Sequence, residues 1–304
     1  MKKVALYSGQ GSQYVGMLKD YYENNNESRD LIDKADEILG YSLSKICFNG
    51  PVDKLKETRY TQPAIFLHSV IVNNLIKNRI SIDAVAGHSV GEYAALYSAE
   101  VVSFEDAISL VSLRGELMFK TGETEPGTMF AVIGMEDEVL INLCKELNSE
   151  NNVIVPANFN SPGQIVISGS RDYLRNNSGI FKERGARMVM ELPVSGAFHS
   201  PLMKPAQEKL AEAINGIKFK DATIPVFTNV DALSETNSEL LKKKLIDQLT
   251  APVLWTQILN NLQKDGYTEF IEMGPGNVLQ GLCKRSLKDI NISGIDKLQD
   301  IENV

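Results

Sequence analysis

The chain has few cysteines, few histidines and no long apolar run. Its three cysteines, at positions 47, 144 and 283, lie far apart and show no C-x-x-C spacing. They favour neither a disulfide framework nor a zinc site, and they are typical of a reducing compartment. The apolar run at residues 4–7 is too short for the hydrophobic region of a signal peptide, and no stretch approaches the ~20 residues of a membrane span. We therefore expect a cytoplasmic protein that does not contact a membrane.

The chain also has fewer basic than acidic residues. The 304 residues include 31 Lys and Arg against 39 Asp and Glu, a formal net charge of −8. A general nucleic-acid binder needs a basic face, so we expect no nucleic-acid partner. A hydrophobic content of 43% in a chain of this length predicts a large core and one or two domains.

The most informative stretch is Gly87-His88-Ser89-Val90-Gly91. A short apolar run, residues 82–86, precedes it, and a helical pattern, residues 92–99, follows it. Strand, G-x-S-x-G and helix together form the nucleophile elbow, a tight turn that exposes the serine hydroxyl toward the first N–H groups of the helix. An ordinary glycine-rich turn between a strand and a helix gives the same pattern, and the flanking elements favour the elbow.

The order of elements predicts an α/β fold. Strand–glycine–helix units on both sides of residues 123–196 predict a mostly parallel sheet covered by helices, like that of α/β-hydrolases. Between them the pattern changes to β-α-β-β-α-β, the order of a ferredoxin-like unit. We expect a large catalytic domain from residues 1–122 and 197–304 and a small ferredoxin-like domain from residues 123–196. The local patterns also predict a helix start at 61–63, a chain break at 122–127, a loop at 159–163, a strand at 224–229 and a helix at 252–262.

A glycine-rich loop, residues 8–13, follows the first predicted strand. A dinucleotide-binding loop is not predicted, because Tyr14 occupies the position of the third glycine. We expect the loop to bring backbone N–H groups close to a ligand oxygen instead.

Ser89 needs a base, because a serine hydroxyl is a weak nucleophile at neutral pH. Among the three histidines, His68 falls inside a predicted core helix, and His88 is adjacent to Ser89, where side chains at an elbow diverge. His199 remains, and elimination favours it over an ordinary loop histidine. No clear acid lies between Ser89 and His199 at a strand end, so a backbone carbonyl or an amide is a candidate to orient the ring.

Arg114 lies on the apolar stripe of a predicted helix, among Leu110, Val111 and Leu117. A buried guanidinium needs an anionic partner. An exposed head group or an ion pair with a neighbouring glutamate would explain this position, and so would a clamp for a substrate carboxylate. The stripe alone slightly favours a structural role.

Several motifs, taken together and in this order, resemble one family. They are Gly9-Gln10-Gly11-Ser12-Gln13, Thr61-Gln62-Pro63, Gly87-His88-Ser89-Val90-Gly91-Glu92-Tyr93, Asn158-Phe159-Asn160-Ser161-Pro162-Gly163-Gln164, Gly196-Ala197-Phe198-His199-Ser200 and Gly274-Pro275-Gly276. The chain resembles the malonyl-CoA:acyl carrier protein transacylases of fatty acid synthesis over nearly its whole length.

The resemblance implies a role for each matching residue. Ser89 would carry the malonyl group, and His199 would act as general base and then as general acid. The N–H groups of Gln10 and Val90 would form the oxyanion hole. Arg114 matches the arginine that binds the malonyl carboxylate. In the same way, Gln248 matches a glutamine whose backbone carbonyl orients the histidine, and Phe198 matches the residue found in malonyl-selecting members.

The resemblance also implies the partners. Malonyl-CoA would be the donor and the phosphopantetheine thiol of acyl carrier protein the acceptor, with no cofactor and no metal, and a monomer is expected. Three alternatives stay open: an acyltransferase that loads polyketide synthase carrier domains, a serine hydrolase or thioesterase, and an inactive module that binds carrier protein. Arg114 argues against the second, and the intact Ser89 and His199 argue against the third.

Overall fold

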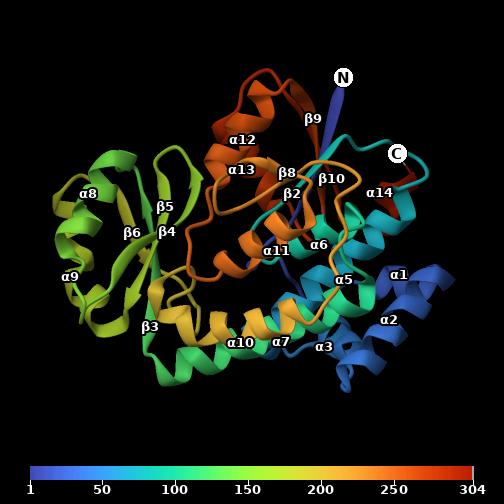
Figure 1. The fold of residues 1–304 in the computed structure, drawn as a ribbon, viewed down its shortest axis with the longest axis horizontal. Coiled ribbons are helices and arrows are strands. Elements are labelled where there is room, and N and C mark those ends of the chain that lie inside the picture. The colour runs from blue at the N-terminus through green and yellow to red at the C-terminus, as the bar shows by residue number, and fades with distance from the viewer. Residues whose placement is uncertain (303–304) are drawn as a thin grey trace.

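The computed structural model describes residues 1–302, which form two sheets with helices packed around them (Figure 1). The larger sheet has six strands in the order β10-β9-β1-β2-β7-β8. Neighbouring strands from β10 to β7 are parallel, and only β8 pairs antiparallel, with β7. The strands are β1 (Lys2–Tyr7), β2 (Ala84–Gly87), β7 (Val226–Phe227), β8 (Ser234–Glu235), β9 (Tyr267–Met273) and β10 (Asn291–Ile295).

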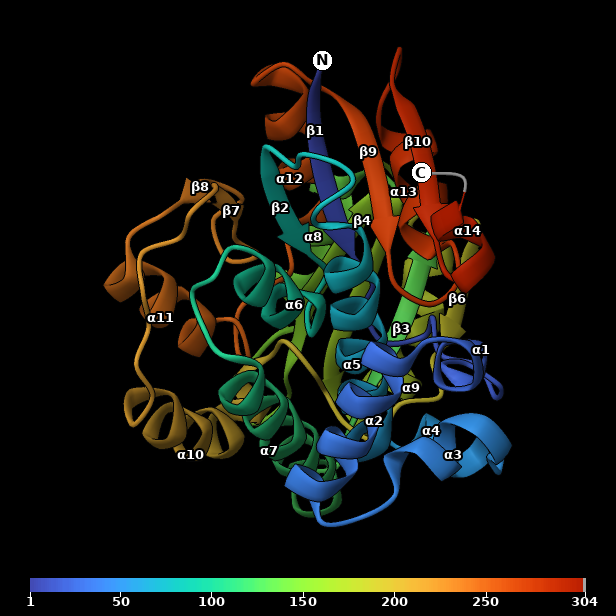
Figure 2. The same ribbon diagram turned by 90° about the vertical axis from the view of Figure 1, so that its right-hand side faces the viewer.

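The central strand β1 is buried on both faces. Ala5 and Tyr7 belong to one core cluster, and Val4 and Leu6 belong to another. The first cluster includes residues of α5 (Thr58–Ile76), α6 (Gly91–Ser98) and α7 (Phe104–Thr124), and the second includes residues of α12 (Trp255–Lys264) and α13 (Val278–Ser286). Two covered faces require a continuous apolar run rather than alternation, as the sequence has here. Figure 2 shows α5, α6 and α7 in front of the strands.

The helices of the larger body differ widely in length, from five residues in α4 (Val52–Lys56) to 21 in α7. None of the helices within residues 1–302 combines the length and apolar character needed to cross a membrane. The helices around the larger sheet are α1 (Lys19–Asn24), α2 (Asn26–Leu39), α3 (Leu43–Asn49), α4 (Val52–Lys56), α5 (Thr58–Ile76), α6 (Gly91–Ser98), α7 (Phe104–Thr124), α10 (Lys204–Asn215), α11 (Ser238–Asp247), α12 (Trp255–Lys264), α13 (Val278–Ser286) and α14 (Leu298–Glu302).

The smaller sheet is antiparallel, in the order β4-β5-β3-β6. Phe130 and Val132 of β3 (Gly127–Ile133) pack in a core cluster with residues of α8 (Asp137–Leu147) and α9 (Arg171–Glu183), whereas Met129 and Ala131 join the main core. This unit has the predicted ferredoxin-like order (green in Figure 1). Its elements are β3 (Gly127–Ile133), α8 (Asp137–Leu147), β4 (Ile154–Ser161), β5 (Gln164–Ser170), α9 (Arg171–Glu183) and β6 (Met188–Glu191).

The fold class is confirmed, and the division into domains at 122/123 and 196/197 stays a prediction. The segment before α12 pairs with the smaller sheet across that division, because Val253 pairs with Asn158 of β4 in an isolated parallel bridge. This pairing keeps residue 253 extended, so α12 begins at Trp255 and not at Pro252 as predicted.

Two other predicted boundaries are wrong for reasons of packing. Helix α5 begins at Thr58, so Pro63 lies inside the helix and not in its first turn. At this interior position the proline removes one backbone hydrogen bond of the helix, because it has no N–H to donate. Helix α7 runs through Gly122 instead of ending there. A Cβ at Gly122 would lie 2.0 Å from the carbonyl oxygen of Ser195, so this glycine permits close packing of two backbones and does not break the helix.

The predicted loop and strand lengths also need correction. Strand β4 continues to Ser161, which leaves only residues 162–163 as a tight turn before β5. Strand β7 covers only Val226–Phe227 of the predicted 224–229, because the chain turns at Thr228, whose N–H donates to Leu233.

Candidate active site

The predicted elbow is present between β2 and α6. Ser89 adopts a φ of 52°, a strained left-handed conformation that an L-residue holds only where the surroundings enforce it. A Cβ at Gly87 would lie 2.0 Å from the carbonyl group of Gly91, and a Cβ at Gly91 would lie 2.2 Å from the carbonyl oxygen of Tyr7. The two glycines therefore let the turn close on itself and against β1.

His199 lies against the Ser89 hydroxyl. The Ser89 Oγ–His199 Nε2 distance is 2.8 Å, and His199 itself has a φ of 56°. Its Nδ1 lies 2.9 Å from the carbonyl oxygen of Gln248 and 3.2 Å from that of Ala251. Because both neighbours are acceptors, Nδ1 carries the proton and Nε2 presents a lone pair to Ser89.

The electrostatic surroundings keep this imidazole neutral. Burial lowers the pKa of His199 to about 3, and the positive charge of Arg114 acts in the same direction. A neutral imidazole facing a serine hydroxyl is the state that a general base needs.

Arg114 lies on the other side of Ser89. Its Nη2 is 3.0 Å from Ser89 Oγ and 3.0 Å from Gln248 Oε1, and its Nη1 is 2.7 Å from Gln62 Oε1. The side chain is 1% exposed, and no carboxylate of residues 1–302 lies within ion-pair distance of it. The structural explanations weighed from the sequence, an exposed head group or an ion pair with a glutamate, are therefore wrong.

The two candidate oxyanion donors belong to segments that pack against each other at the elbow. Val90 is the N-cap residue of α6, and Gln10 follows β1 in the glycine-rich loop. Within the described chain, neither backbone N–H donates a hydrogen bond. The loop packs on the elbow, since a Cβ at Gly9 would lie 2.7 Å from the carbonyl oxygen of His88. Both N–H groups are thus available to a ligand oxygen, and their role stays a prediction.

The other two histidines point elsewhere, as predicted. His68 is fully buried in α5, with Nε2 3.3 Å from Asp296 Oδ1. His88 Nε2 lies 2.9 Å from Asn160 Oδ1, and its ring packs against Trp255. Of the three histidines, only His199 contacts Ser89.

Phe198 is 5% exposed and belongs to the main core cluster. Its ring lies beside Gly196, where a Cβ would be 3.2 Å from Phe198 Cε1. The structure thus places Phe198 next to His199 in the chain but largely within the core, and its predicted role in acyl selection stays a prediction.

Three residues of the site had no predicted role. Gln62 accepts a hydrogen bond from Arg114. Glu92 accepts hydrogen bonds from the Gln248 amide and the Asn229 N–H, and the Asn229 side chain accepts one from the Ser89 N–H. Burial raises the pKa of Glu92 to about 7, and the N–H groups of Asn229 and Gln248 act in the opposite direction. A carboxylate directly after the elbow, on an otherwise apolar helix, was the available signal for Glu92. Asn229 gave no such signal.

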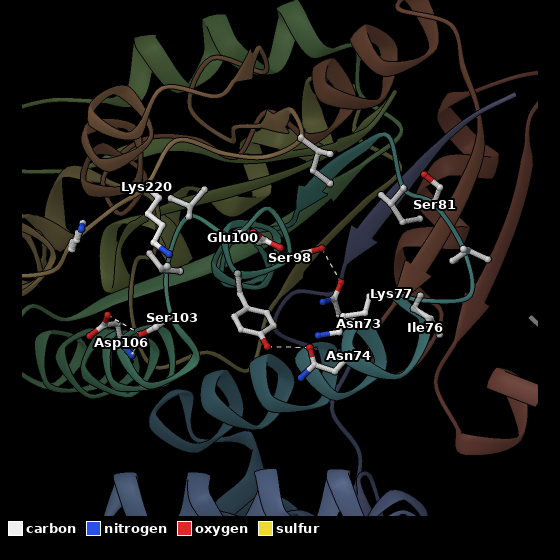
Figure 3. Close-up of a pocket in the computed structure, with 17 residues that line it drawn as sticks. Asn73, Asn74, Ile76, Lys77, Ser81, Ser98, Glu100, Ser103, Asp106 and Lys220 are labelled. Carbon is white, nitrogen blue, oxygen red and sulfur yellow. Dashed lines mark hydrogen bonds between the residues drawn. The ribbon is translucent and has the colours of Figure 1, made fainter.

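A cavity of about 630 Å³ lies at the far end of α6 from Ser89. Figure 3 shows Asn73 and Asn74 of α5, Ser98 at the end of α6, and Lys220 around it. Asn73 Oδ1 accepts hydrogen bonds from Ser98 and from Tyr7. None of the residues that position the Ser89 hydroxyl lines this cavity.

Comparison with known proteins identifies the family. The family model of the acyl transferase domain matches residues 4–302. A malonyl CoA-acyl carrier protein transacylase of Bacillus subtilis (strain 168) is 43% identical over 304 residues, which cover 98% of this chain and 96% of the relative. The enzyme of the same name from Staphylococcus aureus (strain MSSA476) is 39% identical over 99% of this chain and 97% of its own length.

The chain belongs to the malonyl-CoA–acyl carrier protein transacylase family. The resemblance seen in the sequence motifs is thereby confirmed.

Solved transacylase structures have the same fold. The crystal structure of an acyl carrier protein S-malonyltransferase from Vibrio cholerae superposes with a TM-score of 0.95 at 39% identity, covering 100% of this chain and 99% of that one. A malonyl-transacylase in complex with a type II polyketide synthase acyl carrier protein also gives 0.95, at 35% identity and coverage of 100% and 98%. The α/β fold class holds for this transacylase family member as it does for those structures.

Proposed function

We propose that the protein transfers a malonyl group from malonyl-CoA to the phosphopantetheine thiol of acyl carrier protein, through a malonyl-Ser89 intermediate, and so supplies fatty acid synthesis. The observation that carries the proposal is the Arg114 guanidinium, buried with no carboxylate of residues 1–302 at ion-pair distance and 3.0 Å from the nucleophile. Such a group is costly unless a carboxylate meets it, and a guanidinium meets one with two parallel hydrogen bonds. Malonate supplies that carboxylate.

The acylation half-reaction uses the groups around Ser89. His199 Nε2 accepts the proton of Ser89 Oγ as this oxygen attacks the thioester carbonyl carbon. The N–H groups of Gln10 and Val90 stabilise the negative charge that develops on the carbonyl oxygen. The C–S bond then breaks, and His199 returns the proton to the departing sulfur of coenzyme A.

The second half-reaction is the reverse with another thiol. The phosphopantetheine sulfur gives its proton to His199 Nε2 and attacks the ester carbonyl, and Ser89 Oγ leaves and regains the proton. One imidazole serves both steps, because its Nδ1 stays bound to the carbonyl oxygens of Gln248 and Ala251 throughout. The proposal requires no cofactor and no metal.

The assembly and location that we propose follow from the same features. Every group in the scheme comes from one chain, so a monomer suffices. The three cysteines are free and buried, as expected of a protein in the reducing cytoplasm.

Intact-mass spectrometry tests the proposal. Protein mixed with malonyl-CoA should gain the mass of one malonyl group, and added holo acyl carrier protein should remove it and become malonylated. Ser89→Ala should show no adduct. Absence of the adduct in the wild type would contradict the proposal, and rapid loss of the adduct to water without carrier protein would favour a hydrolase.

A polyketide carrier protein is the second candidate acceptor, because one of the similar solved structures holds a carrier protein of that kind. Parallel transfer assays with carrier proteins from fatty acid and polyketide synthases would decide between them. Faster transfer to the fatty acid carrier protein is expected.

A further inference from the structure

A buried carboxylate is hydrogen-bonded to residues that contact Ser89 and Arg114. Glu92, in the first turn of α6, is 1% exposed. Its Oε2 accepts two hydrogen bonds, from the backbone N–H of Asn229 at 2.9 Å and from Nε2 of Gln248 at 3.1 Å. It makes no ion pair with Arg114, the nearby cation, because the amide of Gln248 lies between them.

The Gln248 amide has a defined orientation. Its Nε2 donates to Glu92 Oε2 and, at 3.0 Å, to the carbonyl oxygen of Ser89. Its Oε1 accepts from Arg114 Nη2 at 3.0 Å. A flipped amide would point its NH2 group at the guanidinium and its oxygen at two other acceptors, so that every contact would be repulsive. Glu92 is therefore one of the two acceptors that fix the direction of the amide.

This direction decides where the Arg114 charge is held. Nη2 is shared between Gln248 Oε1 and Ser89 Oγ, while Nη1 is held by Gln62. Without the Gln248 acceptor, Nη2 keeps only the Ser89 hydroxyl as a partner, and the guanidinium is less firmly held toward the nucleophile. A paired contact with a carboxylate depends on that geometry.

We propose that Glu92 is a positioning residue which, by orienting the Gln248 amide, holds Arg114 toward Ser89 and thereby sets the preference for acyl groups that end in a carboxylate. The inference rests on the proposed malonyl transfer and deepens it. Glu92 acts as a hydrogen-bond acceptor, so a glutamine at position 92, whose amide oxygen can accept the same two N–H groups, should keep the preference.

A second path from Glu92 has to be separated from this one. Asn229, the other donor to Glu92, accepts the Ser89 N–H at 2.7 Å and donates to the Gly87 carbonyl at 2.7 Å. Damage through Asn229 would distort the elbow and would slow the transfer of every acyl group alike. Damage through Gln248 and Arg114 would slow only carboxylate-bearing ones, so the acyl ratio distinguishes the two paths.

The experiment is competitive acylation of Ser89 from a mixture of malonyl-CoA and acetyl-CoA, with the two adducts counted by mass spectrometry. The ratio reports only molecules that are folded, so partial unfolding of a variant does not change it. The variants are Glu92→Ala, Glu92→Met of similar volume, Glu92→Gln, Gln248→Ala and the double variant of Glu92→Ala with Gln248→Ala. Glu208→Gln is the control, since Glu208 is an exposed acid on α10 that contacts none of the residues of this network.

We expect Glu92→Ala and Glu92→Met to lower the malonyl-to-acetyl ratio roughly tenfold or more, as the loss of a hydrogen bond that serves a charged group implies. Glu92→Gln and the control should stay within about threefold of the wild type, on the same scale. The double variant should match Gln248→Ala, because residues that act through one another are not additive.

Three results would overturn the inference. They are an unchanged ratio in both Glu92→Ala and Glu92→Met, a ratio in Glu92→Gln as low as in Glu92→Ala, and additive effects in the double variant. A wild type without malonyl preference would instead overturn the proposed function itself, so the two failures are distinguishable.

Discussion

At the scale of single residues, the site holds one buried guanidinium with no carboxylate among its hydrogen-bond partners. Arg114 has three amide or hydroxyl partners and no acid, and burial lowers the pKa of its guanidinium. Because its hydrogen-bond partners are all neutral and only the more distant Glu92 carboxylate acts on its charge, we expect this guanidinium to attract an anion. Its neighbour His199, in contrast, is held neutral by the same low-dielectric surroundings.

Arg114→Ala should reverse the acyl preference from malonyl toward acetyl. Losing one partner of a buried charged pair costs about 2–5 kcal/mol, which corresponds to roughly thirtyfold to several thousandfold in malonyl transfer. Acetyl-CoA has no carboxylate and should lose far less. Competitive acylation of Ser89 measures the ratio.

Arg114→Lys is the matched variant. It should rescue malonyl transfer poorly, because an ammonium group cannot make two parallel contacts. An equal fall for both acyl groups in Arg114→Ala would assign the arginine a structural role.

The pH dependence should lack the inflection of an ordinary histidine. Since the pKa of His199 is lowered to about 3, its imidazole stays neutral when the pH falls through the usual value near 6.5. The rate of Ser89 acetylation from acetyl-CoA, which avoids the carboxylate contact, should therefore be flat between about pH 5 and 7 as far as His199 is concerned. A loss of rate with an apparent pKa near 6.5 would contradict the burial of this ring.

The lowered pKa of His199 also makes the free energy of unfolding depend on pH. Between about pH 3 and 6.5 the unfolded chain binds a proton at His199 that the folded protein excludes. The free energy of unfolding should therefore decrease as the pH falls through this range. Urea unfolding at pH 7 and pH 5 should show a smaller decrease for His199→Asn than for the wild type.

At the scale of elements, the sequence predicted what depends on local pattern. The elbow, α8 and the core helix around His68 follow from periodicity and from glycine placement. The predicted boundaries at Pro63 and Gly122 were wrong because proline and glycine were taken as helix boundaries without knowledge of the segments that pack against them. Gly122 is explained only by Ser195, which lies far along the chain.

The candidate site divides in the same way. The motif and elimination pointed to Ser89 and His199, and the structure brings these two side chains together. The apolar stripe around Arg114 slightly favoured a structural role, and only the family resemblance indicated a carboxylate clamp. The catalytic and binding roles stay predictions. Asn229 could not be predicted, because its task is to bond Ser89 and Gly87 across more than a hundred residues. Contacts between residues so far apart in the chain produce no sequence pattern from which they could be predicted.

The end of α6 gives a prediction about stability. Glu100 has a φ of 61° directly after the helix, and the N–H of Val101 donates to the Leu96 carbonyl at 2.9 Å, as in a Schellman motif. Glycine adopts this conformation without steric cost, so Glu100→Gly should raise the free energy of unfolding by about 1 kcal/mol. Chemical denaturation measures it.

Glu100→Ala is the control for that experiment. Alanine keeps the Cβ that causes the strain. The exposed Glu100 side chain makes no hydrogen bond or ion pair within residues 1–302, so this variant should gain little. An equal gain in both variants would show that the glutamate side chain itself is destabilising.

At the scale of the whole molecule, an acidic enzyme has to meet its carrier protein. The family resemblance implies an acidic carrier, and the chain carries a net charge of −8. Docking would then need local basic residues. The candidates are exposed on the surface around α9, β6 and α13: Lys182, Arg184, Arg187, Lys284 and Arg285.

Salt should weaken carrier protein use far more than malonyl-CoA use. Exposed charges separated by more than about 8 Å are screened at physiological ionic strength, whereas the buried Arg114 is not. Steady-state assays at increasing salt, with one substrate saturating, separate the two responses. Equal responses would remove the docking proposal.

Charge reversal localises the effect. Lys284→Glu and Arg285→Glu should raise the KM for the carrier protein, whereas Lys45→Glu, on the exposed face of α3, should not. If all three behave alike, net charge rather than a local surface determines docking.

The way in which His199 is held has a consequence for genetics. The acceptors at its Nδ1 are main-chain carbonyls of residues 248 and 251, and no codon change can delete a main-chain carbonyl. A saturation scan of single substitutions would thus find a nucleophile and a base but no third member of the triad. The position of these two carbonyl groups depends instead on the path and length of the segment between α11 and α12. We expect single-residue insertions and deletions there to be as damaging as substitution of the histidine itself.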